Sequence, residues 1–303
     1  MLATPAKELP RDDGRWAYEF KWDGVRALVF VADGQVRVQG RSRRDFTGQY
    51  PEVTGLGAAL ATSGTRDVVL DGEIVALGPD GTPSFQTLQR RMHVASSHDV
   101  RARMADTPVI FLAFDMLRLG GTTTVERPYV ERRARLEELG LSANNWQTPP
   151  SQVGDGDAVL AVSRTRGLEG VVAKRLDSPY ELGRRSRSWL KIKNKRHEQL
   201  VIGGWAEGTG NRTGRIGAVL VGYHDGDGLR YAGNVGSGFT DKMLKELHMR
   251  LALLARDDCP FVNPPRWPHL HFVEPVLVCD VEFTEWTEER TLRHPVFKGL
   301  RES

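Results

Sequence analysis

The sequence has little cysteine and no long apolar run. Only Cys259 and Cys279 occur among 303 residues, and neither belongs to a CxxC pair or has histidines at metal-binding spacing. This excludes a zinc framework and a disulfide framework, so both are expected to be ordinary thiols. No stretch approaches the roughly 18 apolar residues of a membrane span, and no secretion signal is recognisable near the start. The sequence therefore predicts a cytoplasmic protein with no membrane partner.

The remaining composition is that of an ordinary globular protein. Hydrophobic residues make up 40% and charged residues 27% of the chain, with neither a repeat nor a low-complexity tract. Such values exclude the disordered and fibrous classes. A chain of 303 residues is longer than one compact core usually needs. We therefore expect two domains, each with a core of its own.

Positive charge is concentrated in two places. The net charge is only +3, but Arg164–Arg196 contains eleven Lys or Arg against three Asp or Glu, a local balance of +8 that leaves −5 elsewhere. A second cluster comprises Arg41, Arg43 and Arg44. A charge run is usually a solvated face, whereas basic residues placed beside a catalytic site favour a polyanionic partner. The motifs nearby therefore decide between the two interpretations.

Alternating apolar and polar residues predict antiparallel sheets in the first half of the chain, with helices packed outside them. Two Asp-Gly pairs, Asp33-Gly34 and Asp71-Gly72, predict hairpin turns. Strands are expected at Arg15–Lys21, Val25–Ala32, Gln35–Gln39, Val68–Leu70, Ile74–Leu77, Val109–Leu117, Gly170–Arg175 and Ser188–Lys193, and helices at Phe85–Met92, Tyr129–Leu139 and Ala158–Arg166.

A charged segment, Asn194–Glu198, is expected to separate two domains of different texture. Short strands beyond it predict a five-stranded barrel with an inserted helix, the outline of an OB fold, although a generic small barrel would give the same pattern. The predicted class is α+β, with antiparallel sheets flanked by helices in residues 1–194 and the barrel in 195–303. The barrel strands are expected at Leu200–Trp205, Ile216–Tyr223, Leu229–Val235 and within His271–Phe283, and its helix at Asp241–Ala255.

The strongest local signal is a lysine at the end of an expected strand, within the run from Glu19 to Arg26. Lysine becomes a nucleophile once its amine is neutral, and nearby cations or desolvation lower its pKa enough to allow that. Arg26 is a candidate cation. A K-x-D-G string such as Lys21–Gly24 nevertheless arises by chance in roughly one chain of this length in ten at average composition. It therefore needs support from other residues.

Further residues supply what transfer of a nucleotide requires. Carboxylates beside glycines suit Mg²⁺ bound to phosphate, and an aromatic ring suits a base. Two lysines that alternate on a strand face one phosphate together, and arginines add bidentate contacts. Each residue alone has an ordinary alternative as a surface acid, a core ring or a solvated cation. The candidate carboxylates are Glu73 and Glu169, and the candidate ring is Phe114. The candidate lysines are Lys191 and Lys193, and the candidate arginines are Arg41 and Arg185.

In their order along the chain, these pieces resemble the motif series of the ATP-dependent DNA ligases, which are lysine-adenylating nucleotidyltransferases. The ending Leu292–Glu302 resembles the family's last motif, carried on an OB domain. The details are most similar to the ligase domain of bacterial end-joining (type D) ligases or their standalone relatives. The remaining motifs are K-x-D-G at Lys21, D-G-E at Asp71, F-D-x-L at Phe114, E-G-V-V-A-K at Glu169 and W-L-K-I-K at Trp189.

The resemblance implies a role for each matching residue. Residues 1–194 would form the nucleotidyltransferase (adenylation) domain, with AMP from ATP bound covalently to Lys21. Glu169 would bind Mg²⁺ or Mn²⁺, and Glu73 would contact the ribose or the metal's water shell. At the base, Glu19 would contact adenine and Phe114 would be the stacking platform. Ribose and phosphates would be contacted by Arg26 and Arg41, and the α-phosphate would be surrounded by Arg185, Lys191 and Lys193. Pyrophosphate would be bound by Arg293 and Arg301, assisted by Lys298.

The implied function is the sealing of 5′-phosphate and 3′-hydroxyl breaks in nicked or broken duplex DNA, as nick repair or end joining. The protein would act as a monomer at the bacterial nucleoid, with a DNA-end-binding repair protein as a further partner. A hinge near Asn194–Arg196 would let the barrel close over ATP and then DNA. The family's last motif usually continues with an acid and a lysine, whereas Glu302-Ser303 follows Arg301 here, which implies slow adenylation.

Two rival functions stay open at this point. An RNA ligase or a GTP-dependent capping-type enzyme would share the K-x-D-G motif, which names neither the base nor the strand. A non-enzymatic OB-fold nucleic-acid-binding protein would interleave aromatic and basic residues on the barrel. Trp205 and Tyr223 are candidates for such contacts, but basic residues concentrate in the first domain.

Overall fold

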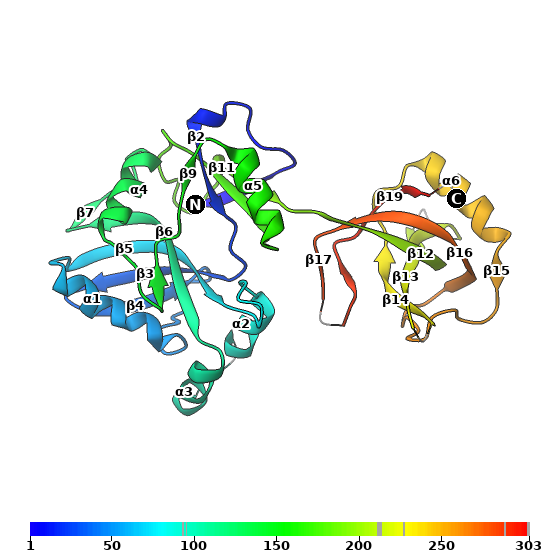
Figure 1. Cartoon of the computed structure of the whole chain (residues 1–303), viewed down its shortest axis with the longest axis horizontal. Helices are drawn as coiled ribbons and strands as arrows, with labels where there is room; N and C mark the ends of the chain where they lie inside the picture. Colours follow the sequence, from blue (N-terminus) through cyan, green and yellow to red (C-terminus); the bar gives the residue numbers. More distant parts are fainter. Residues whose placement is uncertain (93, 95, 211–213, 227, 288, 302–303) are drawn as a thin grey trace. The chain divides into compact units, whose positions relative to one another are not determined.

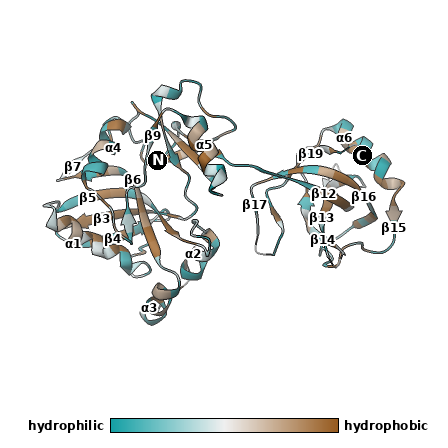
Figure 2. Ribbon diagram, viewed as in Figure 1, coloured by the Kyte–Doolittle hydropathy of each residue, from teal (hydrophilic) through white to brown (hydrophobic). Residues whose placement is uncertain are grey.

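The computed structural model describes residues 1–92, 94, 96–210, 214–226, 228–287 and 289–301 (Figure 1). The chain divides into two compact units, Met1–Asn194 and Lys195–Ser303. Among the described residues, no helix is both long and apolar enough to cross a membrane. In Figure 2, hydrophobic residues run along β6, whereas α6 mixes hydrophobic and hydrophilic residues, as a helix on a surface does.

The first unit contains a mainly antiparallel sheet whose strands follow the order β4-β3-β5-β6-β7, with β8 parallel to β6. Its first hairpin turns at Asp33 and Gly34, which have φ values of 47° and 80°. Those left-handed values match the expected Asp-Gly turn. The strands are β3 Val25–Ala32, β4 Gln35–Gly40, β5 Asp67–Ala76, β6 Val109–Leu119, β7 Thr122–Thr123 and β8 Trp146–Gln147.

The turn predicted at Asp71-Gly72 is wrong, because β5 runs through both residues without a break. Gly72 is needed for close approach instead: a Cβ there would lie 2.4 Å from the Phe111 ring and 2.5 Å from the Leu112 carbonyl oxygen. The register with β6 shifts between Asp71 and Gly72. An Asp-Gly pair in a strand thus marks a register shift at which the absence of a side chain lets the neighbouring strand approach closely.

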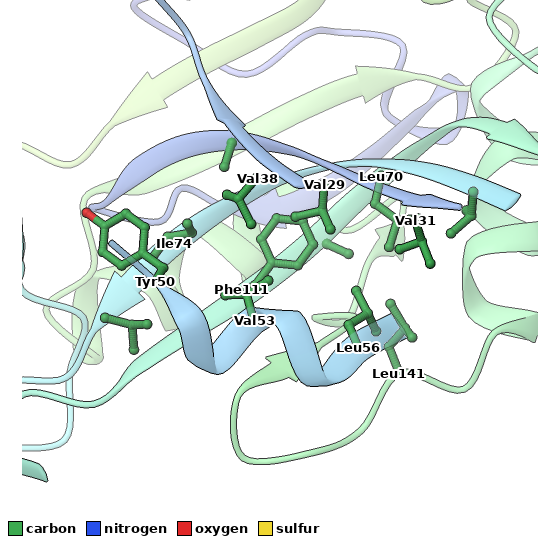
Figure 3. Packing of buried hydrophobic residues seen from close by; sticks show 14 of the residues in the cluster. Val29, Val31, Val38, Tyr50, Val53, Leu56, Leu70, Ile74, Phe111 and Leu141 are labelled. Carbon is green, nitrogen blue, oxygen red and sulfur yellow. The ribbon is translucent and has the colours of Figure 1, made fainter. Parts of the chain in front are cut away.

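Helices cover this sheet and form its core with it. Val53 and Leu56 meet Phe111 and Val29, and all four side chains are fully buried (Figure 3). The sequence predicted α2 at its bounds and α4 and α5 to within two residues, but it missed α1 and α3. The helical segments are η1 Asp13–Arg15, η2 Pro51–Gly55, α1 Leu56–Thr62, α2 Phe85–Met92, α3 Ser97–Asp106, α4 Tyr129–Glu138 and α5 Gly156–Thr165.

A second sheet in this unit has the order β1-β11-β10-β2-β9, with β1 parallel to β11 and the other pairs antiparallel. Leu160 of α5 packs on Tyr18 and Val171 from the sheet. Side chains on the other face of β2 and β10 are free to line the pocket described below. The strands are β1 Leu2–Ala6, β2 Trp16–Phe20, β9 Gln152–Val153, β10 Gly170–Arg175 and β11 Arg185–Lys193.

The second unit is a sheet in the order β14-β13-β12-β16-β15, with β19 beside β16, a helix α6 and a small ribbon of β17 and β18. The expected charged linker is partly strand, because β12 begins at Arg196. The helix is shorter than predicted and ends at Ala252, since Ala255 pairs in β15. The elements are β12 Arg196–Glu207, β13 Ile216–Asp225, β14 Gly228–Val235, α6 Asp241–Ala252, β15 Ala255–Arg256, β16 Leu270–Phe283, β17 Glu285–Trp286, β18 Leu292–Arg293 and β19 Val296–Leu300.

Candidate functional site

A cavity of about 250 Å³ opens in the first unit, and eight of the predicted site residues line it. Lys193 and Glu169 lie beside it and are connected to it through Lys21. The two sheets contribute the cavity walls together. The lining residues are Leu2, Ala3, Glu19, Phe20, Lys21, Trp22, Arg26, Arg41, Glu73, Phe114, Val172, Lys174, Arg185, Trp189 and Lys191.

Lys21 directly follows β2, and its backbone N–H donates to the Gly170 carbonyl at 2.8 Å. Its ammonium group is bonded to the carboxylate of Glu169, whose other oxygen lies 2.6 Å from Lys193 Nζ. Although burial opposes ionisation of Glu169, the two lysines hold the pKa of its carboxyl below the ordinary value. Burial and the neighbouring Lys21 lower the pKa of Lys191. The nucleophile candidate therefore lies beside two further cations, Lys191 and Lys193, that are suited to phosphate, and in contact with one carboxylate, Glu169.

The loop after Lys21 is held against the first sheet. The Asp23 carboxylate accepts from the Phe85 N–H at 3.3 Å, at the start of α2. Gly24 has no room for a side chain, since a Cβ would lie 2.3 Å from the Ile74 carbonyl oxygen and 2.9 Å from Glu73 Cγ. The glycine thus lets the loop lie directly on β5, which fixes the direction of Lys21.

We expect Gly24→Ala to displace this loop and to lower both stability and self-modification of Lys21. Overpacking of this kind costs about 1–3 kcal/mol. Chemical denaturation and incorporation of label from nucleotide measure the two effects. Gly14→Ala is the matched control, because a Cβ at Gly14 meets nothing within 4 Å. Equal behaviour of the two variants would contradict the proposed role of Gly24.

A buried ion pair forms the back of the cavity. Lys174 Nζ lies 2.8 Å from each carboxylate oxygen of Glu19 and 3.0 Å from the Phe114 carbonyl oxygen, and both charged side chains are almost fully buried. The Tyr129 hydroxyl also donates to Glu19, and Arg133 Nη1 lies 3.7 Å away. Burial lowers the pKa of Lys174, although the Glu19 and Asp115 carboxylates oppose this.

Lys174 was missed as a site residue, although one signal for it was present: a charge follows an otherwise apolar run in β10. Its ammonium also lies 4.5 Å from the ring centroids of Phe114 and Trp189. Phe114 lines the cavity with 9% of its surface exposed. The partners Tyr129 and Arg133 sit one helical turn apart on α4 and gave no signal, because only the fold brings them to Glu19.

Arg26 lines the cavity, but its guanidinium is bound to Asp71 through two hydrogen bonds, of 2.9 and 2.5 Å. The Tyr180 hydroxyl donates to the same carboxylate at 2.7 Å. Despite burial, the Asp71 charge raises the pKa of Arg26. In this arrangement Arg26 forms part of the cavity wall, and its predicted contact with ribose and phosphates stays a prediction.

The two predicted metal residues differ in their surroundings. Burial raises the pKa of Glu73 to about 8, against the opposing charges of Lys21 and Arg26, whereas Glu169 is ionised between two lysines. No group of three acidic, histidine or cysteine side chains among the described residues is arranged to hold a metal alone. Mg²⁺ commonly uses only one or two carboxylates together with substrate phosphates. The donor set of Glu73 and Glu169 therefore fits a metal that binds with a nucleotide.

The cavity lining also includes Arg41, Arg185 and Lys191. These three predicted phosphate contacts therefore share the cavity with Lys21. Arg293 and Arg301 belong to the second unit, where Arg293 pairs with Glu285 at 2.7 Å and Arg301 lies 3.5 Å from Asp280. The departure predicted at Glu302-Ser303 lies outside the described residues.

Comparison with known proteins gives consistent matches over both units. Residues 1–193 match the family model "ATP dependent DNA ligase domain", and residues 212–303 match "ATP dependent DNA ligase C terminal region". The chain is 40% identical over 304 residues to the multifunctional non-homologous end joining DNA repair protein LigD of Mycobacterium tuberculosis, covering 99% of this chain and 38% of that relative. A probable DNA ligase of Streptomyces griseus is 35% identical over 95% of this chain and 55% of its own length.

Two solved structures resemble the chain along its whole length. The ligase domain of M. tuberculosis LigD has a TM-score of 0.58 and 39% identity, covering 99% of this chain and 93% of that one. A mycobacterial DNA ligase D complexed with ATP and MES has a TM-score of 0.57, with the same identity and coverage. The chain thus spans about two fifths of the full-length LigD relatives, and it matches almost all of their separately solved ligase domain.

Proposed function

Since this chain belongs to the family of ATP-dependent DNA ligases, we propose that Lys21 carries AMP between ATP and a DNA break. The observation that carries this assignment is the position of Lys21 in a cavity lined by Arg41, Arg185 and Lys191, with the buried Glu19–Lys174 pair behind it. Such a cavity offers cations for phosphates at one end and aromatic and polar groups for a base at the other. We assign the nucleotidyltransferase domain to residues 1–194 and the OB domain to 195–303.

In the first step, the Lys21 amine forms a bond to the α-phosphorus of ATP, and the bond from that phosphorus to the leaving oxygen breaks to release pyrophosphate. The amine must lose a proton, and the Glu169 carboxylate is the group that contacts Nζ. Positioning and charge neutralisation dominate such transfers. Lys191 and Arg185 offset charge on the α-phosphate. Mg²⁺ or Mn²⁺ held by Glu169 and Glu73 would neutralise phosphate oxygens further.

In the later steps, AMP passes from Lys21 to the 5′-phosphate of the break, and the 3′-hydroxyl then displaces AMP to close the strand. The basic segment Arg164–Arg196 borders the cavity through Lys174, Arg185 and Lys191. It is therefore placed to bind DNA phosphates beside the adenylate. Arg293 and Arg301 of the OB domain are assigned to the pyrophosphate.

The biological setting is proposed from the relatives. The LigD proteins are named for non-homologous end joining, so double-strand ends are proposed as a substrate beside nicks. A DNA-end-binding repair protein is proposed as the partner that brings this chain to ends. Because the proposed substrate is DNA, the proposed location is the nucleoid. The chain would act there as a monomer.

The function is tested by sealing of a nicked duplex. With ATP and Mg²⁺ or Mn²⁺, a denaturing gel should show conversion of a labelled 5′-phosphate strand to the joined product. GTP in place of ATP and a nicked RNA duplex in place of DNA are the comparisons. Faster sealing of RNA, or sealing with GTP alone, would contradict the substrate assignment. Binding of the nick without joining would favour the non-enzymatic alternative.

A further inference from the structure

The carboxylate of Glu282 in β16 contacts three basic side chains at once. Its Oε1 lies 2.8 Å from Lys195 Nζ, and its Oε2 lies 3.1 Å from Lys298 Nζ and 3.7 Å from His197 Nε2. The contacts come from both neighbouring strands, because Glu282 is opposite His197 of β12 and opposite Val296 of β19. Lys195 is the first residue of the second unit, and Lys298 belongs to the strand of the last motif.

Because Glu282 is buried, the loss of its ion pairs costs more free energy than the loss of ordinary surface pairs. Glu282 is 8% exposed, whereas the Lys195 and Lys298 side chains are 47% and 41% exposed. Burial disfavours the charged form, yet Lys195 and Lys298 hold the pKa of Glu282 below the ordinary value. A buried carboxylate that loses every cation pays a large desolvation cost. With two lysines in contact, either one can leave while the other still compensates the charge.

The arginines of the last motif are held differently. Arg293 pairs with Glu285, and Arg301 lies near Asp280. Those carboxylates are 44% and 42% exposed, and no second Lys or Arg contacts either of them among the described residues. Water can therefore replace either arginine at small cost. Lys298 is thus the cation of this motif whose release depends on another side chain.

We propose that Glu282 positions Lys298 and that Lys195 is the counter-ion which lets Lys298 leave Glu282 for the phosphates of ATP. This inference rests on the proposed function, in which the last motif on the OB domain supplies cations to the leaving pyrophosphate, and it adds Lys298 of β19 to Arg293 and Arg301. It also gives the segment that joins the two units a part in adenylation, because Lys195 lies at its end.

The test measures the rate at which ATP adenylates Lys21 in the full chain. Lys195→Met leaves Lys298 as the remaining lysine on Glu282, so adenylation should slow by about tenfold, the effect of retaining one charge-assisted hydrogen bond. Adding Glu282→Gln to Lys195→Met removes the anion that retains Lys298 and should restore much of the rate.

Three controls separate the possible failures. Lys298→Met should slow adenylation, and if it does not, the proposed role of β19 in the first step is wrong. Asp225→Asn breaks an exposed pair with Arg230 of 3.0 Å in the same unit and should change nothing. Sealing of a pre-adenylated nick releases no pyrophosphate. With saturating nicked DNA, which offsets the loss of a phosphate contact from the basic segment, Lys195→Met should therefore slow this sealing much less than it slows adenylation. Thermal unfolding verifies that each variant is folded.

Two results would overturn the inference while leaving the ligase assignment standing. One is a Lys195→Met protein that adenylates as fast as the parent while Lys298→Met is slow. The other is a double variant no faster than Lys195→Met alone, since a purely structural role of Glu282 predicts that the second change only adds damage.

Discussion

A Lys21→Ala variant should take up no label from ATP labelled at the α-phosphate, a loss on the order of 10³-fold or more. The reason is that no other amine in the cavity has the same position. Lys174 is buried against Glu19, and Lys191 projects from a different strand, β11. Denaturing gel electrophoresis after incubation with ATP and Mg²⁺ or Mn²⁺ measures the covalent adduct.

The same variant provides its own evidence of folding. A nick that already carries AMP on its 5′-phosphate needs no lysine nucleophile, so Lys21→Ala should still join such a substrate. Lys7→Ala, at an exposed lysine of the same unit, is the matched control and should label like the parent. Persistent labelling of Lys21→Ala would assign the nucleophile to another residue and remove the first step of the mechanism.

The second large effect is expected for Lys174→Met, which should destabilise the first unit by about 3–5 kcal/mol. The substitution leaves the Glu19 carboxylate buried with only Tyr129 and Arg133 nearby. A buried carboxylate whose remaining cation lies 3.7 Å away is poorly compensated, and this is costly because little water reaches it. Urea denaturation followed by a probe in the first unit measures the change, since two units need not unfold together.

A double variant distinguishes this charge effect from simple loss of packing. Adding Glu19→Gln to Lys174→Met removes the stranded charge, so part of the lost stability should return. Arg127→Met, which breaks an exposed pair with Glu131 in the same unit, is the control and should cost less than about 1 kcal/mol. If Lys174→Met lost as little stability as the control, the Glu19–Lys174 pair would not be what stabilises the back of the cavity.

Several elements could be predicted because local patterns are strong there. Alternation of apolar residues gave β3 at its observed bounds, a short strand-like segment gave β10, and helical spacing gave α2. The predicted class, a nucleotidyltransferase domain followed by an OB domain, is confirmed by the ligase-domain structures of the relatives. Membership of the ATP-dependent DNA ligase family is likewise confirmed by the family models. Ordered motifs carry this information because each has a chemical reason to keep its residue types.

The sequence could not decide between alternatives where two chemical environments share one local signal. Asp71-Gly72 suits a turn, but a glycine that must let Phe111 approach looks identical in sequence. Arg26 suits a phosphate contact, and it also suits the buried carboxylate of Asp71 that it binds here. Only contacts across strands decide between such alternatives.

By itself the sequence determined the secondary structure of the strongly periodic segments, the two-part composition of the chain and the residue types around Lys21. Only the tertiary structure decided that Glu169 contacts Lys21, 148 positions away, that Lys174 and Tyr129 meet at Glu19, and that Glu282 collects two lysines. The physical reason is that periodicity and turn chemistry act over a few neighbouring residues. The partner of a buried charge is set instead by which strands pair and which face each side chain takes.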